Sequence, residues 1–367
     1  MIKKPRSKIE KNKPKVIGIV GGGQLGRMIA FSAQKRGHQV VVLSDQENSP
    51  ASQVVEKVII GDFKDEKVLQ KFCDAVDIAT IEFENIPYKT AEFIAKKIDF
   101  MPSAKILKTT QNRLLEKNFL KNIKVKTTEF LEIKNITQLQ NGIKNFKKAV
   151  LKTASMGYDG KGQQILDDKI NHQELAQIFE KFAHQELILE KFCKFDSEIS
   201  VIVARSLTGE IICYEPVSNI HKNGILQRSI FPAKITARQK IQAKNIAKKI
   251  AISLDLIGII AVEFFVFGEQ LLVNELASRP HNSGHFSMDA CVTSQFEQLI
   301  RAITGSKLGA VDCTTSVIME NLIGDQIYDL EKYQQNPYAK IHLYGKGEAK
   351  DGRKMGHVNI LKKIKTL

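Results

Sequence analysis

The sequence contains no tryptophan, no long apolar run and few cysteines. The last two features exclude several classes of protein. No apolar run approaches the ~20 residues that a membrane-spanning helix requires, and the N-terminus has no apolar segment of the signal-peptide type. The cysteines are odd in number and far apart, which argues against a disulfide framework or a CxxC metal site; they are Cys73, Cys193, Cys213, Cys291 and Cys313. We therefore expect a protein of the reducing cytoplasm with no membrane partner.

The chain has a large excess of basic residues. It carries 55 Lys and Arg against 40 Asp and Glu, a formal net charge of +15. Residues 1–15 hold seven of the basic residues and one Glu, so we expect a disordered basic tail there. The remaining excess fits nucleic acid, an anionic small substrate or only a lysine-rich proteome. Because the basic residues are spread along the chain without a recognised nucleic-acid motif, we expect no nucleic-acid partner.

Length and patterning predict more than one domain. A chain of 367 residues suits two or three domains. Over residues 16–110, short apolar strands alternate with helices, which predicts a Rossmann-like α/β domain with a mainly parallel sheet. Residues 111–306 have a mixed α+β character, and residues 307–367 predict a small α+β cap. The elements expected most clearly are strands at Val16–Val20, Gln39–Leu43, Ile78–Ile81, Ala149–Lys152, Leu187–Glu190, Ile199–Ala204, Ile211–Glu215 and Leu226–Ile230, and helices at Gln24–Arg36, Gln111–Lys121 and Ala237–Leu254.

Two glutamates near residue 270 are the most informative feature. Their segment, VEFFVFGEQLLVNE (residues 262–275), is rich in β-branched and aromatic residues around a glycine, which predicts a β-hairpin. If Phe267 and Leu271 close a three-residue loop, Glu263 and Glu275 lie opposite each other on one face. Like charges placed there destabilise a sheet, so we expect a cation between them. Mg²⁺ takes carboxylate oxygens together with nucleotide phosphates. The alternative is that one glutamate points to solvent after a register slip, or pairs with a lysine.

A glycine-rich turn near the N-terminus allows three interpretations. Residues 21–26, GGGQLG, follow a strand and open a helix, and Asp45 lies nineteen residues beyond. This spacing satisfies the dinucleotide fingerprint, so one alternative is a nicotinamide-dependent oxidoreductase. Glycines at a helix N-terminus also favour any other phosphate. The third interpretation is a tight strand–helix turn that binds no ligand.

A second glycine-rich segment follows the strand that ends at Lys152. Residues 157–163, GYDGKGQ, combine three glycines with a lysine and predict a mobile loop that closes over phosphates, with Lys152 reaching the α- or β-phosphate. The GxxxxGK[ST] spacing is absent, so the loop is not a P-loop. Further on, the short segment 190–193, EKFC, follows an apolar strand and suits an adenine edge and ribose hydroxyls, although the signal is weak by itself.

Taken in order, these segments resemble the ATP-grasp superfamily. Within it, the chain is most similar to the purine-pathway ligases that carboxylate 5-aminoimidazole ribonucleotide. The resemblance spans nearly the whole chain after the basic tail, and its motifs are IGIVGGGQLGRM (17–28), EFENIP (82–87), GYDGKGQ (157–163), NELASRPHNSGH (274–285), SQFEQLIRAITG (294–305) and HLYGKGEAKDGRKMGH (342–357). It implies an N-terminal parallel-sheet domain, a central ATP-grasp domain that binds ATP and Mg²⁺ between two α+β subdomains, a small C-terminal cap and a homodimer.

The resemblance also implies roles for individual residues. The metal ligands are Glu263 and Glu275, although two carboxylates do not distinguish Mg²⁺ from Mn²⁺. The ATP-binding positions are Arg113, Lys152, Gly157, Tyr158, Asp159, Gly160, Lys161, Gly162, Gln163, Glu190, Lys191, Phe192, Cys193, Glu198, His221, Asn274 and Glu275. The ribonucleotide positions are Gln24, Leu25, Glu82, Tyr158, Asp159, Lys161, Arg279, Lys346 and Arg353. The catalytic positions, where bicarbonate and its phosphorylated form are held, are Arg279, His281 and Asn282, together with Lys152.

The implied reaction joins ATP, bicarbonate and 5-aminoimidazole ribonucleotide, and it releases ADP and phosphate. Bicarbonate first attacks the γ-phosphate to give carboxyphosphate, and the exocyclic amine of the ribonucleotide then captures the carboxyl group. No residue is identified as a general base from the sequence; His281 is a candidate, and hydrogen-bonded scaffolding is the alternative for it. The nearest rivals are other ATP-grasp ligases, such as a formate-dependent transformylase or a biotin-type carboxylase, but the C-terminal motif argues against both.

Overall fold

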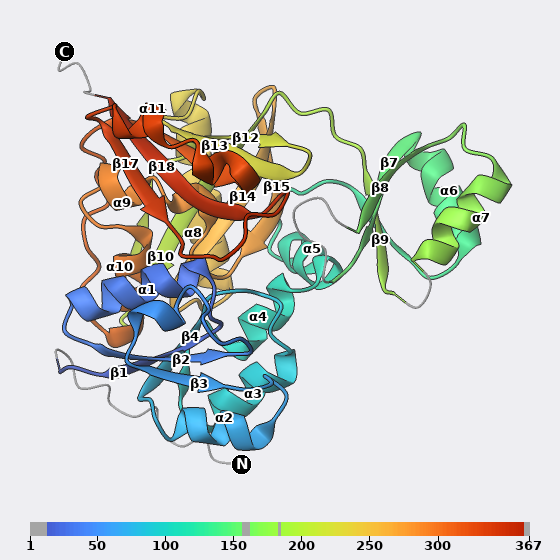
Figure 1. Ribbon diagram of the computed structural model, residues 1–367. Coiled ribbons are helices and arrows are strands. Elements are labelled where there is room, and N and C mark those ends of the chain that lie inside the picture. Colours follow the sequence, from blue (N-terminus) through green and yellow to red (C-terminus); the bar gives the residue numbers. More distant parts are fainter. Residues whose placement is uncertain (1–12, 156–161, 183–184, 363–367) are drawn as a thin grey trace.

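The N-terminal region forms a parallel sheet covered by helices. The computed structural model describes residues 13–155, 162–182 and 185–362 (Figure 1). Five strands are ordered β3-β2-β1-β4-β5 and pair in parallel. Their apolar runs, such as VIGIV and IATI, are typical of strands buried on both faces. The strands are β1 Val16–Val20, β2 Gln39–Ser44, β3 Lys57–Ile60, β4 Ile78–Ile81 and β5 Asp99–Phe100, and the helices are α1 Gln24–Lys35, η1 Ser52–Val54, α2 Glu66–Cys73, α3 Tyr88–Lys97 and α4 Ala104–Thr110. The predicted Rossmann-like arrangement is confirmed.

A small antiparallel sheet stands away from the rest of the molecule, at the right of Figure 1. Its four strands are ordered β6-β9-β7-β8, and α6 and α7 pack their apolar faces against it. Helix α5, Arg113–Asn122, leads into this region and begins at Asn112, whose side chain accepts from the backbone N–H groups of Leu114 and Leu115. The other elements are β6 Phe130–Ile133, α6 Ile136–Phe146, β7 Lys148–Thr153, β8 Gln163–Asp167, α7 His172–Lys181 and β9 Leu187–Lys191.

A nine-stranded sheet forms the centre of the molecule. Its strands are ordered β15-β14-β10-β12-β13-β16-β18-β17, with β11 paired to β10. Helix α8 packs against one part of this sheet, and α10 contacts both the sheet and α1, so that one apolar core joins the N-terminal region to the sheet. The elements are β10 Ser197–Arg205, β11 Ile211–Cys213, β12 Val217–Lys222, β13 Ile225–Phe231, α8 Ala237–Ser253, β14 Gly258–Phe267, β15 Gln270–Ala277, η2 Asn282–Gly284, α9 Ser287–Ala290 and α10 Gln295–Thr304.

The C-terminal strands extend the same sheet. The predicted α+β content is present, but β16 pairs with β13 in antiparallel register, so these strands do not form a separate layer. The elements are β16 Ser316–Ile323, η3 Gly324–Tyr328, α11 Glu331–Gln334, β17 Ala339–Leu343 and β18 Lys354–Lys362. Sequence patterning named no strand at the positions of β6, β8 and β12 in residues 111–306. Among the described residues, no helix is long and apolar enough to cross a membrane.

Candidate active site

The hairpin β14–β15 brings the two predicted metal ligands together, but its loop length and its register differ from those predicted. The three-residue loop predicted from the sequence is wrong, because Phe267 pairs with Gln270 and the loop has two residues, with Gly268 at φ +53°. The register then shifts between Phe264 and Val262, so Asn274 and Glu275 together oppose Glu263. This bulge adds the residue that the shorter loop lacks. Glu263 and Glu275 therefore face each other across the strands as expected.

Glu263 lies in a buried environment with an excess of negative charge. Burial and then the charge of Glu275 raise the pKa of Glu263 to about 8. On the neighbouring strands, His221 Nδ1 lies 2.7 Å from Glu198 Oε2. Burial, the largest single effect, lowers the pKa of His221, but the hydrogen bond with Glu198 and the charges of Glu198, Glu263 and Glu275 together outweigh burial, so the net shift is upward. Two carboxylates that repel each other in a buried site are suited to holding a cation. No cluster of three or more metal-ligating side chains is found in the described part of the chain.

His281 is oriented by its neighbours as a hydrogen-bond donor. The backbone N–H of Ser283 donates to His281 Nδ1, so the ring proton belongs on Nε2, which lies 3.4 Å from Glu263 Oε1. Burial first, and then the charge of Arg279, lower the pKa of His281 well below its usual value. A neutral ring engaged on both nitrogens is suited to positioning Glu263 rather than to abstracting a proton.

Glu190, on the small sheet, lies between two lysines. Its carboxylate is 3.2 Å from Lys152 Nζ and 3.4 Å from Lys117 Nζ, and it accepts a 3.1 Å hydrogen bond from the Thr128 hydroxyl. Burial alone would raise the pKa of Glu190, but the two ammonium groups outweigh it and lower the pKa to about 2. Sequence reasoning found Lys152 and Glu190 and missed Lys117, which is 1% exposed on α5. A lysine within an apolar helical face gives little local signal.

The remaining ATP-binding predictions lie on α5, at the start of β8, and at the end of β9. Arg113 begins α5 and donates to the carbonyl of Thr153 at 3.3 Å. Lys191 pairs with Glu129, and the ring of Phe192 lies beneath Lys148 Nζ, 4.3 Å from its centroid. Cys193 is half-buried. Gln163 opens β8 opposite Lys152, and Gly162 has φ +71°. The predictions for Gly157, Tyr158, Asp159, Gly160 and Lys161 lie outside the described residues.

Polar atoms without partners gather in the segment that follows β15. Arg279 Nε and both amide atoms of Asn282 are buried and have no hydrogen-bond partner. The Arg279 guanidinium is held by Glu84, 3.5 Å away, and Glu84 also accepts from the backbone N–H of Ser278 at 2.9 Å. Buried polar groups are normally paired. These three atoms therefore indicate a place for a small polar ligand.

Gln295, which sequence reasoning missed, fixes this segment in place. Its fully buried carboxamide accepts from the backbone N–H of His281 at 2.9 Å and donates to the His281 carbonyl at 2.7 Å. Its Nε2 also lies 3.0 Å from Nδ1 of His285. A Cβ on Gly284 would lie 2.4 Å from Gln295 Oε1, so glycine is required there. The carboxamide thereby determines the position of the segment that carries the predicted bicarbonate residues.

The glycine turn before α1 is filled by a side chain of the same protein. Glu82 accepts hydrogen bonds from the backbone N–H groups of Gly23 at 2.9 Å and Gly26 at 3.4 Å. A Cβ on Gly23 would lie 2.6 Å from Glu82 Oε1. The glycines therefore serve the approach of this carboxylate, and a dinucleotide pyrophosphate at the same N–H groups would have to displace it. Gln24 and Leu25 begin α1 beside Glu82, where the ribonucleotide predictions lie.

The two predicted phosphate-binding cations lie in the C-terminal region. Lys346 Nζ donates to the carbonyl of Lys354 at 2.7 Å, and Arg353 donates to the carbonyl of Glu348 at 3.0 Å. Lys346 also lies close enough to Glu82 to lower the pKa of that carboxyl, although burial, the larger effect, raises it. Lys346 of the C-terminal region and Glu82 of the N-terminal region, both predicted to bind the ribonucleotide, therefore lie near each other.

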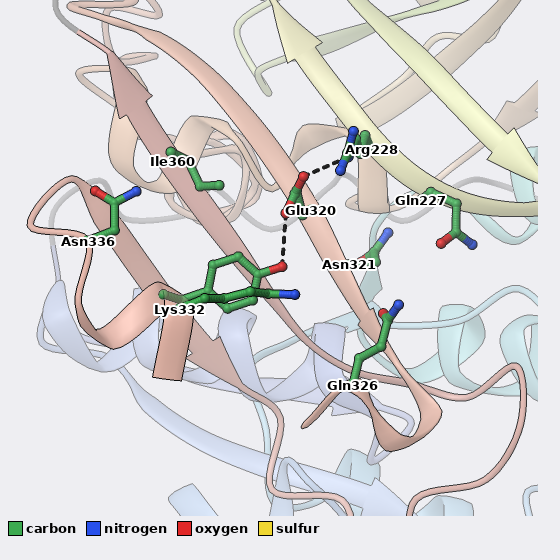
Figure 2. A pocket seen from close by; sticks show the side chains of 9 residues that line it. Gln227, Arg228, Glu320, Asn321, Gln326, Lys332, Asn336 and Ile360 are labelled. Atoms are coloured by element: carbon green, nitrogen blue, oxygen red, sulfur yellow. Dashed lines mark hydrogen bonds and ion pairs between the residues drawn. The ribbon is translucent and has the colours of Figure 1, made fainter. Parts of the chain in front are cut away.

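A separate pocket of about 440 Å³ lies between β13, β16 and α11 (Figure 2). Within it, Glu320 lies 2.6 Å from Arg228 Nε and accepts a 2.9 Å hydrogen bond from Tyr333. The predicted site residues that the structure describes do not line this pocket. The charges inside it are already paired, so we do not place the active site there.

The fold and the site define an ATP-grasp ligase. Residues 118–296 match the ATP-grasp domain, residues 14–111 match the ribonucleotide synthetase preATP-grasp domain, and residues 317–366 match the phosphoribosylaminoimidazole carboxylase C-terminal domain. The chain is 40% identical to the N5-carboxyaminoimidazole ribonucleotide synthase of Bacillus subtilis, over 95% of this chain and 91% of that protein. It is also 40% identical to the bifunctional purine synthesis protein purC/E of Dictyostelium discoideum, of which it spans 36%.

Solved structures agree. An ADP complex of an N5-carboxyaminoimidazole ribonucleotide synthetase superimposes with a TM-score of 0.91 at 41% identity, over 96% of this chain and 94% of that one. The Aspergillus clavatus N5-carboxyaminoimidazole synthase in complex with ADP and 5-aminoimidazole ribonucleotide gives 0.88 at 28% identity, over 96% and 95%. The chain belongs to the N5-carboxyaminoimidazole ribonucleotide synthase family.

Proposed function

We propose that the reaction of this family takes place between the small sheet and the hairpin β14–β15. The reaction converts 5-aminoimidazole ribonucleotide and bicarbonate to N5-carboxyaminoimidazole ribonucleotide at the expense of ATP, a step of purine biosynthesis. The observations that carry this placement are the Glu263–Glu275 pair, on which the charge of Arg279 acts, and the unpartnered buried atoms of Arg279 and Asn282. A cation site and an anion site then adjoin each other, as transfer of a phosphoryl group to bicarbonate requires.

A divalent cation fits the hairpin. Burial and the charge of Glu275 raise the pKa of Glu263 even though the charges of His221 and Arg279 act in the opposite direction, so a further cation beside this carboxylate pair would be stabilising. Glu263 and Glu275 would hold Mg²⁺ or Mn²⁺, and Asn274 lies next to them in the bulge. When bound, the ion would neutralise phosphate charge during phosphoryl transfer.

ATP lies along the small sheet in this proposal. The segment 190–193 would bind the adenine edge, and Arg113 with Lys152 would bind phosphate oxygens. Glu198 and its partner His221 would complete the ribose and phosphate contacts. Because Lys152 is paired with Glu190, nucleotide binding requires its ammonium group to exchange a carboxylate for a phosphate, while Lys117 remains to neutralise Glu190. The predicted loop 157–163 would cover the phosphates.

Bicarbonate binds at Arg279 and Asn282. A guanidinium and a carboxamide can together satisfy the oxygens of a small carboxylate. One bicarbonate oxygen attacks the γ-phosphorus, the bond from phosphorus to the β-phosphate oxygen breaks, and carboxyphosphate and ADP result. The ribonucleotide amine then attacks the carboxyl carbon, phosphate leaves, and the amine loses a proton. His281 would position Glu263 in this scheme, since its protonated nitrogen faces that carboxylate.

The ribonucleotide binds between the N-terminal and C-terminal regions. Lys346 and Arg353 would bind its phosphate, and Gln24, Leu25 and Glu82 would contact the remainder. Tyr158, Asp159 and Lys161 would contribute from the covering loop. We further propose domains at residues 16–110, 111–306 and 307–367, and a cytoplasmic location. We also propose a homodimer, which light scattering would test.

The decisive experiment measures ADP release from MgATP and bicarbonate, with and without 5-aminoimidazole ribonucleotide. Strong stimulation by the ribonucleotide, with consumption of its amine, is the expected result. Slow bicarbonate-dependent ATP cleavage without stimulation would move the acceptor to another amine. The absence of any ATP turnover would contradict the proposed reaction.

A further inference from the structure

Two of the five cysteines face each other across a short antiparallel bridge. Cys291 follows α9 and Cys313 precedes β16, and the two are opposite partners outside the named strands. The backbone N–H of Val292 donates to the carbonyl of Asp312 at 3.0 Å, and that of Thr314 donates to the carbonyl of Ala290 at 2.8 Å. Both bonds involve the residues on either side of the cysteines, so the cysteines form a non-hydrogen-bonded pair.

That geometry brings the two sulfurs together. Opposite residues of a non-hydrogen-bonded pair have Cα atoms about 4.5 Å apart, which lies within the range that a disulfide spans. The two Sγ atoms are 2.7 Å apart, and both residues are half-buried, so small reagents can reach them. Cys73 and Cys213 are buried, and Cys193 is half-buried without such an opposite partner among the described residues.

The pair closes a segment next to the candidate active site. The cysteines are 22 positions apart, and α10 with Gln295 lies between them. Just before Cys291, Asp289 accepts from Asn359 Nδ2 on β18 and lies 2.8 Å from His342 Nε2 on β17. A bond between the sulfurs would thus fasten the helix that holds His281 to the strand that begins the C-terminal region.

We propose that Cys291 and Cys313 form a reversible disulfide with each other. The oxidant is a low-molecular-weight disulfide of the glutathione class. One protein thiolate attacks a sulfur of the oxidant and releases one small thiol, which takes up the proton. The second protein thiolate then attacks the mixed disulfide and releases the second small thiol. The protein loses two hydrogens and two electrons, and the oxidant gains them. In a reducing cytoplasm the dithiol is the resting form.

The first test is equilibration of the folded protein with mixtures of glutathione and its disulfide, followed by alkylation and mass spectrometry. We expect a product lighter by the mass of two hydrogens, and a non-reduced digest in which the peptides of Cys291 and Cys313 are joined. The Cys313→Ser variant should instead keep a thiol or a glutathione adduct at Cys291. The matched control is Cys193→Ser, which removes another half-buried thiol and should form the bridge as the original protein does.

The second test is urea unfolding of the oxidised and reduced proteins. Bridging residues 22 positions apart restricts the unfolded chain, so the oxidised form should unfold at higher urea and melt roughly 5 °C higher. Cys291→Ala and Cys313→Ser should remove this redox dependence while melting like the reduced protein. Equal alkylation of Cys291 and Cys193 after oxidation, or a bridge that forms only in urea, would overturn the proposal. Neither test depends on the proposed catalytic activity.

Discussion

Two buried glutamates lie on the two sides of the proposed nucleotide site, and they have opposite electrostatic surroundings. Glu190, on the small sheet, lies between two lysines, and its pKa is lowered to about 2. Glu263, on the large sheet, is buried against Glu275, and its pKa is raised to about 8. The small sheet therefore supplies its own countercharge, whereas in our proposal the hairpin takes its countercharge from a divalent cation bound from solution.

Helix α5 connects these two surroundings through neighbouring residues. Lys117 reaches Glu190, while Glu116 accepts a 2.8 Å hydrogen bond from the backbone N–H of Leu276 on β15. Burial raises the pKa of Glu116 to about 8, and the charge of Glu275 adds to this shift. Two adjacent residues of one helix thus place a lysine at the small sheet and a further carboxyl group at the hairpin.

The largest expected effect comes from removing one charge of the hairpin pair. Glu275→Gln should reduce ADP release by about 1,000-fold or more, since a metal ligand supports transition-state charge. Without added metal, the variant should be at least as stable as the original protein, because a repulsion has been removed. Steady-state ADP release and thermal unfolding measure the two quantities. Glu269→Gln, in the exposed hairpin loop, is the matched control. Near-normal turnover in Glu275→Gln would defeat the metal assignment.

The next effect concerns the opposite side of the site. Lys117→Met should cost about 3–5 kcal/mol in the free energy of unfolding, because it leaves the buried Glu190 with one cation fewer. It should also raise the KM for ATP, since Lys152 becomes the remaining ammonium partner that we identify for Glu190. Lys121→Met, on the exposed face of α5, is the control. Adding Glu190→Gln should restore part of the lost stability, and additive losses in the double variant would contradict the pairing.

Strand patterning and the resemblance were sufficient for the parallel sheet and for Glu263 facing Glu275. The predicted loop was one residue too long, and the bulge at Asn274 and Glu275 compensates for it. A period-2 pattern determines which face a side chain takes, but it does not locate an inserted residue.

Long-range partners could not be predicted in the same way. The glycine turn at residues 21–26 has the sequence of a dinucleotide site, and the group that fills it, Glu82, lies 59 positions from Gly23. Gln295 and Lys117 act through contacts made only after folding, on His281 and Glu190. The glycines in the local sequence indicate that some group must lie close to the backbone of the turn. Only the fold shows that this group is the carboxylate of Glu82.

A smaller effect is expected in the pH dependence of stability. The folded pKa of Glu190, about 2, lies below the ordinary value of 4.5. Its pairing therefore contributes stability that is fully present above pH 4.5 and is lost as the pH falls through about 2. The difference in unfolding free energy between the original protein and Glu190→Gln should stay constant from pH 7 to about 5, then shrink. Urea titrations at each pH measure it, and a difference that grows on acidification would contradict the assigned countercharges.

The smallest effect is expected from substitutions in the C-terminal region, which lies outside both sides of the proposed nucleotide site. Lys346→Ala and Arg353→Ala should each raise the KM for the ribonucleotide about 10-fold, the cost of about one charged hydrogen bond to phosphate. The KM for ATP should hardly change, because these residues lie in the C-terminal region beyond the two glutamates. Lys350→Ala, an exposed lysine in the same loop, is the matched control. Equal increases in both KM values would show that the C-terminal cations act on the nucleotide. The nucleotide site would then include the C-terminal region as well as the small sheet and the hairpin.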